Sequence, residues 1–294
     1  MLRNFFRLNE VPDILRIGSR DDFLALLQQN ARVENAIYLP DELQSSRPQN
    51  VIREKTFCNV SFKDTRFYKI VFRDCQFVDC LFMGCELERC EIHDCSFGGC
   101  NFSKVLIIDT YVDPRYFVAM FDDKQYANIG VWVFQQLRSN ALNTHQPDHF
   151  EVADFEFLRW KRYELIREYK DQTKTFRDVW WRVTFDWLYQ KLMGYGHSLM
   201  RFGVTSLVLF LLIVALNSWF WHYANAGMAM TDEVRNVNGL PRAIYYTILT
   251  LTTVGYGDIT PITEGGMLLA GLEALLGLVW FGMLTSIIVK KVFR

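Results

Sequence analysis

A five-residue period runs through residues 50–112. Every fifth side chain is large and apolar: Ile52, Phe57, Phe62, Phe67, Phe72, Phe77, Phe82, Leu87, Ile92, Phe97, Phe102, Ile107 and Val112. Neither the 3.6-residue period of a helix nor the two-residue period of a strand produces this spacing. A solenoid does, if each five residues form one side of a square coil, so that residues twenty apart stack at about 4.8 Å. The period therefore predicts a little over three coils.

Smaller residues stand two positions before most of the large ones, and six of them are cysteines. These are Cys75, Cys80, Cys85, Cys90, Cys95 and Cys100. Metal sites use short convergent spacings such as C-x-x-C, so we favour a packed core over a metal or redox role. Cys75 should stack under Cys95 and Cys80 under Cys100, and oxidation could bridge these pairs only if the geometry permits.

This segment resembles the pentapeptide-repeat proteins. The resemblance implies a right-handed quadrilateral β-helix over residues 51–112, with residues 1–50 as an N-terminal cap. Cysteine stands here where the family usually has alanine, a mild change because cysteine behaves as a small hydrophobe. Residues 52–112 carry eight basic and nine acidic side chains, the bases early and the acids from residue 74 to 94. Near balance argues against a DNA mimic, so no nucleic acid partner is expected; the segregation fits a solvated face or a docking surface.

Residues 113–175 are predicted to form a cytosolic helical linker. Asp113 and Pro114 end the repeats and can begin a helix. Two further helices are expected over 124–143 and 149–172. This segment is similar to the connector of bacterial proteins that join pentapeptide repeats to a channel, and a packed helical hairpin explains the same pattern.

Residues 176–196 are predicted to form an interfacial helix. FRDVWWRVTFDWLYQKLM mixes three tryptophans with Arg177, Arg182 and Lys191. Aromatic rings at headgroup level with cations toward phosphate suit a membrane interface, although a soluble amphipathic helix has the same composition. Gly194 and Gly196 would permit a bend into the bilayer.

Two apolar runs predict membrane-spanning helices, over about 199–222 and 265–289, inside a domain of residues 197–294. Basic residues precede the first run and follow the second, which places both chain ends in the cytoplasm. The start, MLRNFFRLNEVPD, lacks the apolar core of a signal peptide, so we expect residues 1–195 to stay in the cytosol, where thiols are kept reduced. The expected location is the plasma or inner membrane, with two spans.

A short helix and a glycine-containing loop lie between the two runs. Pro241 can open a pore helix of residues 241–252, too short to cross a bilayer alone. It leads into TTVGYGD, residues 252–258. A dehydrated cation must exchange its water shell for oxygens, so backbone carbonyls must point to one axis. Gly255 and Gly257 allow the backbone angles this needs, and Val254 and Tyr256 would point away.

Here the chain resembles the two-transmembrane potassium channels. The resemblance implies a homotetramer in a lipid bilayer, with potassium as the transported ion and the only bound metal, held in the filter of residues 253–257: Thr253, Val254, Gly255, Tyr256 and Gly257. Asp258 matches the outer-mouth carboxylate, with Tyr246 as its support. Gly277 matches the hinge of the inner helix, and its pore-facing stripe matches Ala274, Leu278, Phe281 and Thr285. Some relatives have a glutamate behind the filter where this chain has Leu249.

Glu273 is a carboxylate inside the second apolar run. Such residues are costly in a membrane and are usually functional. It falls one position off the pore stripe, so we expect it to face the pore helix or a neighbouring subunit. Support of the filter and a neutral, hydrogen-bonded structural role both fit this position.

The main hypothesis is a tetrameric potassium channel whose cytosolic repeat domain regulates or assembles the pore, in response to a cytosolic ligand or protein that the sequence does not identify. The alternative is a membrane-anchored interaction scaffold with a silent pore. We expect neither an arginine-bearing voltage sensor nor a nucleotide-binding regulatory domain. The histidines are scattered and no nucleophile–base spacing stands out, so an enzyme is not expected.

Overall fold

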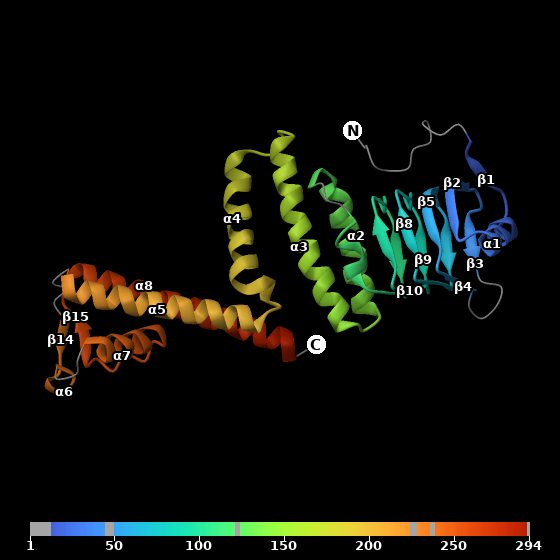
Figure 1. The fold of residues 1–294 in the computed structure, drawn as a ribbon. Coiled ribbons are helices and arrows are strands. Elements are labelled where there is room, and N and C mark those ends of the chain that lie inside the picture. Colours follow the sequence, from blue (N-terminus) through green and yellow to red (C-terminus); the bar gives the residue numbers. More distant parts are fainter. Residues whose placement is uncertain (1–12, 45–49, 121–123, 224–227, 236–238, 293–294) are drawn as a thin grey trace. The chain divides into compact units, whose positions relative to one another are not determined.

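The computed structural model describes residues 13–44, 50–120, 124–223, 228–235 and 239–292 (Figure 1). The chain divides into two compact units, Met1–Asp186 and Trp187–Arg294, and each has its own hydrophobic core. Helix α4, Phe176–Met193, crosses this division.

Parallel strands stack along three faces of the first unit (Figure 1). One sheet contains β1 (Leu15–Ile17), β2 (Arg32–Tyr38), β5 (Thr56–Ser61), β8 (Gln76–Val78) and β11 (Ser96–Gly98). A second contains β3 (Glu42–Gln44), β6 (Arg66–Tyr68), β9 (Glu86–Glu88) and β12 (Leu106–Ile108). A third contains β4 (Asn50–Arg53), β7 (Ile70–Arg73), β10 (Glu91–His93) and β13 (Tyr111–Val112).

The register between most of these strands is twenty residues. Phe57 pairs with Phe77, and Phe77 with Phe97. A fourth line of contact is formed by single bridges from Ser61 to Leu81 and from Leu81 to Asn101. Four lines of contact at this register are compatible with the predicted quadrilateral β-helix.

The corners between the faces have a regular backbone conformation. Every fifth residue from Glu54 to Asp109 has a positive φ, and glycine stands at two of these positions, Gly84 and Gly99. Left-handed residues cost energy unless they are glycine, asparagine or aspartate, so the stacked core must compensate at Lys69, Arg89 and Lys104. The five-residue period of the sequence is thus also a period of the backbone.

Two columns of phenylalanine rings fill the interior. Phe57, Phe77, Phe97 and Phe117 stack with centroids 4.9, 5.1 and 4.7 Å apart, and Phe62, Phe82 and Phe102 stack at 5.3 and 4.6 Å. Phe117 lies in a short 3₁₀ helix, Pro114–Phe117, and continues the column beyond the last strand. Truncating one such ring to alanine typically costs about 3–5 kcal/mol.

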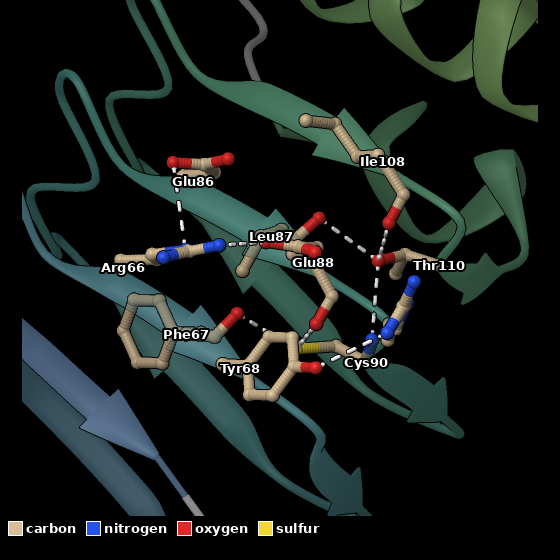
Figure 2. A network of polar contacts seen from close by, with 10 residues as sticks. Arg66, Phe67, Tyr68, Glu86, Leu87, Glu88, Cys90, Ile108 and Thr110 are labelled. Carbon is tan, nitrogen blue, oxygen red and sulfur yellow. Dashed lines mark hydrogen bonds and ion pairs between the residues drawn. The ribbon is translucent and has the colours of Figure 1, made fainter.

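The six cysteines are buried in this core, as predicted. Each of five thiols is bonded to a backbone carbonyl 23 residues earlier, for example Cys85 Sγ to Phe62 O at 2.8 Å and Cys90 Sγ to Phe67 O at 3.3 Å. Thr110 Oγ1 makes the equivalent bond to Leu87 O at 2.9 Å (Figure 2). This bond, which alanine cannot make, gives a physical reason for a small donor at this position.

Charged side chains pair across the outer surface of the second sheet. Arg66 contacts Glu86 at 3.8 Å and also Glu88, and Arg89 Nη1 donates to Tyr68 Oη at 3.1 Å (Figure 2). Arg66 therefore lies one coil from the acidic residues that it contacts.

The sheets begin earlier than the predicted boundary at residue 51. Strands β2 and β3, inside the segment predicted as a cap, pair with β5 and β6. Their register is 24 residues, because Val33 pairs with Phe57 and Leu43 with Phe67. Because this coil has four residues more than the others, its core positions do not follow the five-residue period. Helix α1, Arg20–Gln29, buries Phe23 against the rings of Phe57 and Phe62.

A helical hairpin follows the last strand. It consists of α2 (Ala127–Asn143) and α3 (Pro147–Lys170), close to the two helices predicted. Asn140 exchanges two hydrogen bonds with the backbone of Thr110, of 3.0 and 2.7 Å, and Trp132 Nε1 donates to Val105 O at 2.7 Å. These side chains satisfy backbone groups at the end of the stack, so the predicted linker is part of the domain core.

The second unit contains two helices long and apolar enough to cross a membrane, Leu199–Phe220 and Glu264–Val289. They belong to α5 (Leu199–Tyr223) and α8 (Glu264–Val292). The short helix α7 (Gly239–Leu251) packs against both (Figure 1). A hairpin of β14 (Met228–Met230) and β15 (Ile259–Pro261), with the single turn α6 (Asp232–Arg235), completes the unit.

Helix α4 and the turn after it occupy the predicted interfacial segment. Gly194, Tyr195 and Gly196 all have positive φ, so the chain turns sharply over three residues before α5. α4 buries Val179 and Met193 and exposes most of its aromatic side chains, including Trp180, Trp181, Phe185 and Trp187.

The buried thiols predict a loss of stability at alkaline pH. Burial raises the pKa of Cys85 to about 12 and of Cys90 to about 11, from an ordinary 9.0. Because the folded pKa is the higher one, each thiol stabilises the fold fully below pH 9 and progressively less above it. We expect each to lose about 2–3 kcal/mol by about pH 11. The measurement is the urea midpoint of the full-length protein in detergent as a function of pH. A Cys85→Ala/Cys90→Ala variant should show a shallower decline, and an equal decline would contradict the assignment.

Candidate functional site

The segment between α7 and β15 has an alternating backbone. Thr253, Gly255 and Gly257 have φ of 58°, 47° and 79°, whereas Val254 and Tyr256 have negative φ. The turn is attached to α7, because the amides of Val254 and Gly255 donate to Leu249 O at 3.0 and 3.4 Å. Alternation of this kind lets successive carbonyls face one side of the strand, which is the requirement for coordinating a dehydrated cation.

The carboxylate of Asp258 lies at the C-terminal end of this segment and is held by hydrogen bonds. Asp258 Oδ2 accepts a hydrogen bond of 2.6 Å from Tyr245 Oη, and Thr231 N donates to Asp258 O at 3.1 Å. The partner is therefore Tyr245 and not Tyr246, to which the sequence analysis gave this role. One residue rotates a helix by about 100°, so only one of the two tyrosines can face the loop. Tyr246 is buried instead and has a side-chain hydrogen bond with Thr250.

Helix α8 touches the end of α7 at a glycine. A Cβ on Gly277 would lie 1.9 Å from Leu251 O and 2.7 Å from Leu251 C. Gly277 was predicted as a hinge from its family position. The structure adds a second requirement, because no side chain fits between these two helices at this level.

Glu273 lies one turn before Gly277, on the same face of α8. It is 4% exposed and accepts a hydrogen bond from Asn217 Nδ2 at 3.2 Å. The same nitrogen donates to Thr247 Oγ1 at 2.9 Å. Among the described residues, Glu273 thus bonds to α5, and it reaches α7 only through Asn217. Sequence reasoning missed Asn217 and Thr247, although an amide inside an apolar span is itself a signal of function.

The predicted pore-facing stripe lies on another face of α8. Leu278, Phe281 and Thr285 are exposed, and Ala274 is partly exposed. With Thr253 and residues of the first turns of α8, Ala274 and Leu278 line an open apolar concavity of about 550 Å³. An adjacent stripe, which includes Glu273, Gly277 and Ile287, is buried within the unit. The structure thus separates a face that packs internally from a face left uncovered in one chain.

Comparison with known proteins covers this part of the chain. Residues 200–294 match the ion channel family. Over 65 residues the chain is 38% identical to the potassium voltage-gated channel protein Shal of Drosophila melanogaster. This match covers 20% of this chain and 11% of that protein. It is 30% identical over 94 residues to the potassium voltage-gated channel subfamily A member 5 of Oryctolagus cuniculus and over 95 residues to subfamily A member 4 of Homo sapiens. These two matches cover 32% of this chain and 15% and 14% of the relatives.

The contact at Gly277 can be tested with a matched pair of glycines. Gly277→Ala should displace the end of α7 and destabilise the protein by about 1–3 kcal/mol or more, the usual cost of overpacking. Gly282→Ala, on the same helix, meets nothing within 4 Å and should be neutral. The measurement is the thermal unfolding temperature in detergent. An unfolding temperature equal to that of the wild type in Gly277→Ala would contradict this requirement for close packing.

Proposed function

We propose that residues 197–294 form the pore domain of a potassium-selective ion channel. The observation that carries the proposal is the alternating backbone of residues 253–257, held between a short helix and a hairpin. The carbonyls of Thr253, Val254, Gly255 and Tyr256 would replace the hydration shell of the ion, with Gly257 permitting the turn toward Asp258. The C-terminal end of α7 points its negative dipole toward the ion path. The relatives named as potassium channels support the choice of ion.

The proposal requires four copies of the chain, because one copy supplies one strand of the filter. In a single chain Val254 is 51% exposed and Tyr256 is 74% exposed. Exposed apolar surface of this size at the filter calls for cover from neighbouring subunits. The concavity beside Thr253 and Leu278 offers the same kind of surface. Phe281 and Thr285 would then line the inner pore, at the level where a gate can form.

In the proposed channel both chain ends lie in the cytoplasm, and α4 lies at the membrane surface. The exposed Trp180, Trp181 and Phe185 would sit among the lipid headgroups, with Arg177 and Lys191 near phosphate. The cytosolic part would be a right-handed pentapeptide-repeat β-helix that regulates or assembles the pore.

The internal contacts of the first unit give this regulation a path. The hairpin α2–α3 is joined to the repeats by Asn140, and Arg162 of α3 contacts Asp186 of α4 at 3.2 Å. Arg162 is buried, and losing the partner of a buried charge is costly. Because α4 is one continuous helix that leads through the turn at Gly194–Gly196 into α5, movement of the repeats would be transmitted to the outer helix.

The conduction proposal predicts potassium flux from liposomes that contain purified full-length protein. The flux should exceed sodium flux, be blocked by barium and disappear in Gly255→Ala, since alanine is strained at a positive φ. Gly203→Ala is the control, because a Cβ there meets nothing within 4 Å. Equal potassium and sodium flux, or a protein that crosslinks only as a monomer or dimer, would refute the proposal.

The regulatory proposal predicts that removing residues 1–170 alters the channel. We expect the truncated protein to assemble less well or to open differently, because Arg162 and the hairpin that holds α4 are lost. The measurement compares tetramer yield and barium-sensitive flux with those of the full chain. Unchanged yield and flux would mean that the repeats serve another purpose, as in a membrane-anchored scaffold.

A further inference from the structure

The two membrane-capable helices of the second unit and the short helix α7 between them meet at one buried polar cluster. Asn217 comes from α5, Thr247 from α7 and Glu273 from α8. Their exposed fractions are 1%, 0% and 4% within a single chain. The cluster is therefore complete before any neighbouring subunit is added.

Asn217 connects the three helices. Its Nδ2 atom carries two N–H groups, and the two hydrogen bonds of 2.9 and 3.2 Å account for both. One is made to the pore helix and the other to the inner helix. In a bilayer core no water is available for these groups, so breaking either bond leaves a polar atom unsatisfied.

The neighbouring contacts lie in register with this cluster. Glu273 and Gly277 are four residues apart on α8, as are Thr247 and Leu251 on α7. Glu273 and Thr247 are joined through Asn217. One turn further along both helices, Gly277 is in direct contact with Leu251 because it has no Cβ. Thr247 is four residues before the end of α7, about 6 Å along its axis. A shift of α7 at Thr247 is therefore passed to Leu249 O, which holds the amides of Val254 and Gly255.

We propose that Asn217, Thr247 and Glu273 form a polar clamp that positions the pore helix and, through it, the ion filter, with Asn217 as the positioning residue. The inference rests on the proposed conduction function. It also explains why Leu249 can replace the glutamate that some relatives have at this position. In the proposed clamp the carboxyl behind the pore helix belongs to Glu273 of the inner helix and not to the pore helix itself. Among the residues that the structure describes, Glu273 Oε1 has no hydrogen-bond partner, so the carboxyl keeps one acceptor atom free at this level.

The clamp can be tested without conduction. Amide hydrogen exchange of residues 241–251 is measured in full-length protein in detergent, for the wild type, Asn217→Leu, Thr247→Val and Thr247→Ser. An interhelical hydrogen bond in a membrane changes an equilibrium by about threefold. We expect exchange about threefold faster in Thr247→Val, up to about tenfold faster in Asn217→Leu, where both bonds are lost, and unchanged in Thr247→Ser, which keeps the hydroxyl.

A matched control separates the clamp from general helix packing. Trp280 Nε1 of α8 donates to Ser206 Oγ of α5 at 2.8 Å, a bond between the same two helices that does not reach α7. Ser206→Ala should leave exchange in residues 241–251 unchanged. Equal acceleration in Ser206→Ala, or no acceleration in Thr247→Val, would overturn the clamp. If Asn217→Leu fails to fold, the two Thr247 variants decide the question.

Ion selectivity provides the second readout. In liposomes the ratio of potassium to sodium flux should fall about threefold in Thr247→Val and return to the wild-type value in Thr247→Ser. Wild-type protein without potassium-selective flux would refute the proposed function, while the exchange experiment would still decide the clamp. Faster exchange with an unchanged flux ratio would show that the clamp holds the helix but does not position the filter, and would overturn the inference.

Discussion

The packing of the second unit depends on how closely α8 approaches α7. At Gly277 the two backbones are so near that even a methyl group would overlap Leu251. This approach brings α8 close enough for Glu273 to share a hydrogen-bond donor with Thr247. Small residues at helix contacts and polar bonds between helices are the two means by which helices associate in lipid, since burial of apolar surface gives no advantage there. Both means are used within five residues of α8, directly behind the segment proposed as a filter.

The first unit is stabilised differently, because burial of apolar side chains in its core drives its folding in water. Its coils gain stability from stacked rings, and its polar backbone is satisfied by parallel strands and by small donors such as Cys85 and Thr110. A corner that adopts a positive φ every five residues sets the length of each face. A stack of coils also leaves backbone groups of its last coil without a neighbouring strand on one side. Asn140 and Trp132 of α2 bond to the backbone of Thr110 and Val105 at this end.

The sequence predicted those features that follow from a repeated or strongly apolar pattern. The stacking of the repeats, the burial of the cysteines and the two membrane-capable helices are of this kind. The first coil was missed because four extra residues break its period, although Val33 and Leu43 occupy core positions. The sequence does not distinguish Tyr245 from Tyr246 as the partner of Asp258. Which of two consecutive residues faces the loop depends on the rotation of α7 about its own axis, and tertiary packing decides that rotation. Asn217 was missed because its partners lie 30 and 56 residues away in the sequence.

Helix α4 has properties that neither unit explains alone. A helix that served only as a spacer would have a polar surface, yet α4 covers one narrow stripe and exposes Trp180, Trp181 and Phe185. Exposed tryptophan is costly in water and favourable at a membrane surface. Its Asp186 is bonded to the buried Arg162, so the helix is also held by the hairpin of α2 and α3. The proposed location of α4 at a membrane surface accounts for both observations, because its aromatic side chains would lie among lipid headgroups while Asp186 keeps the helix bonded to the hairpin.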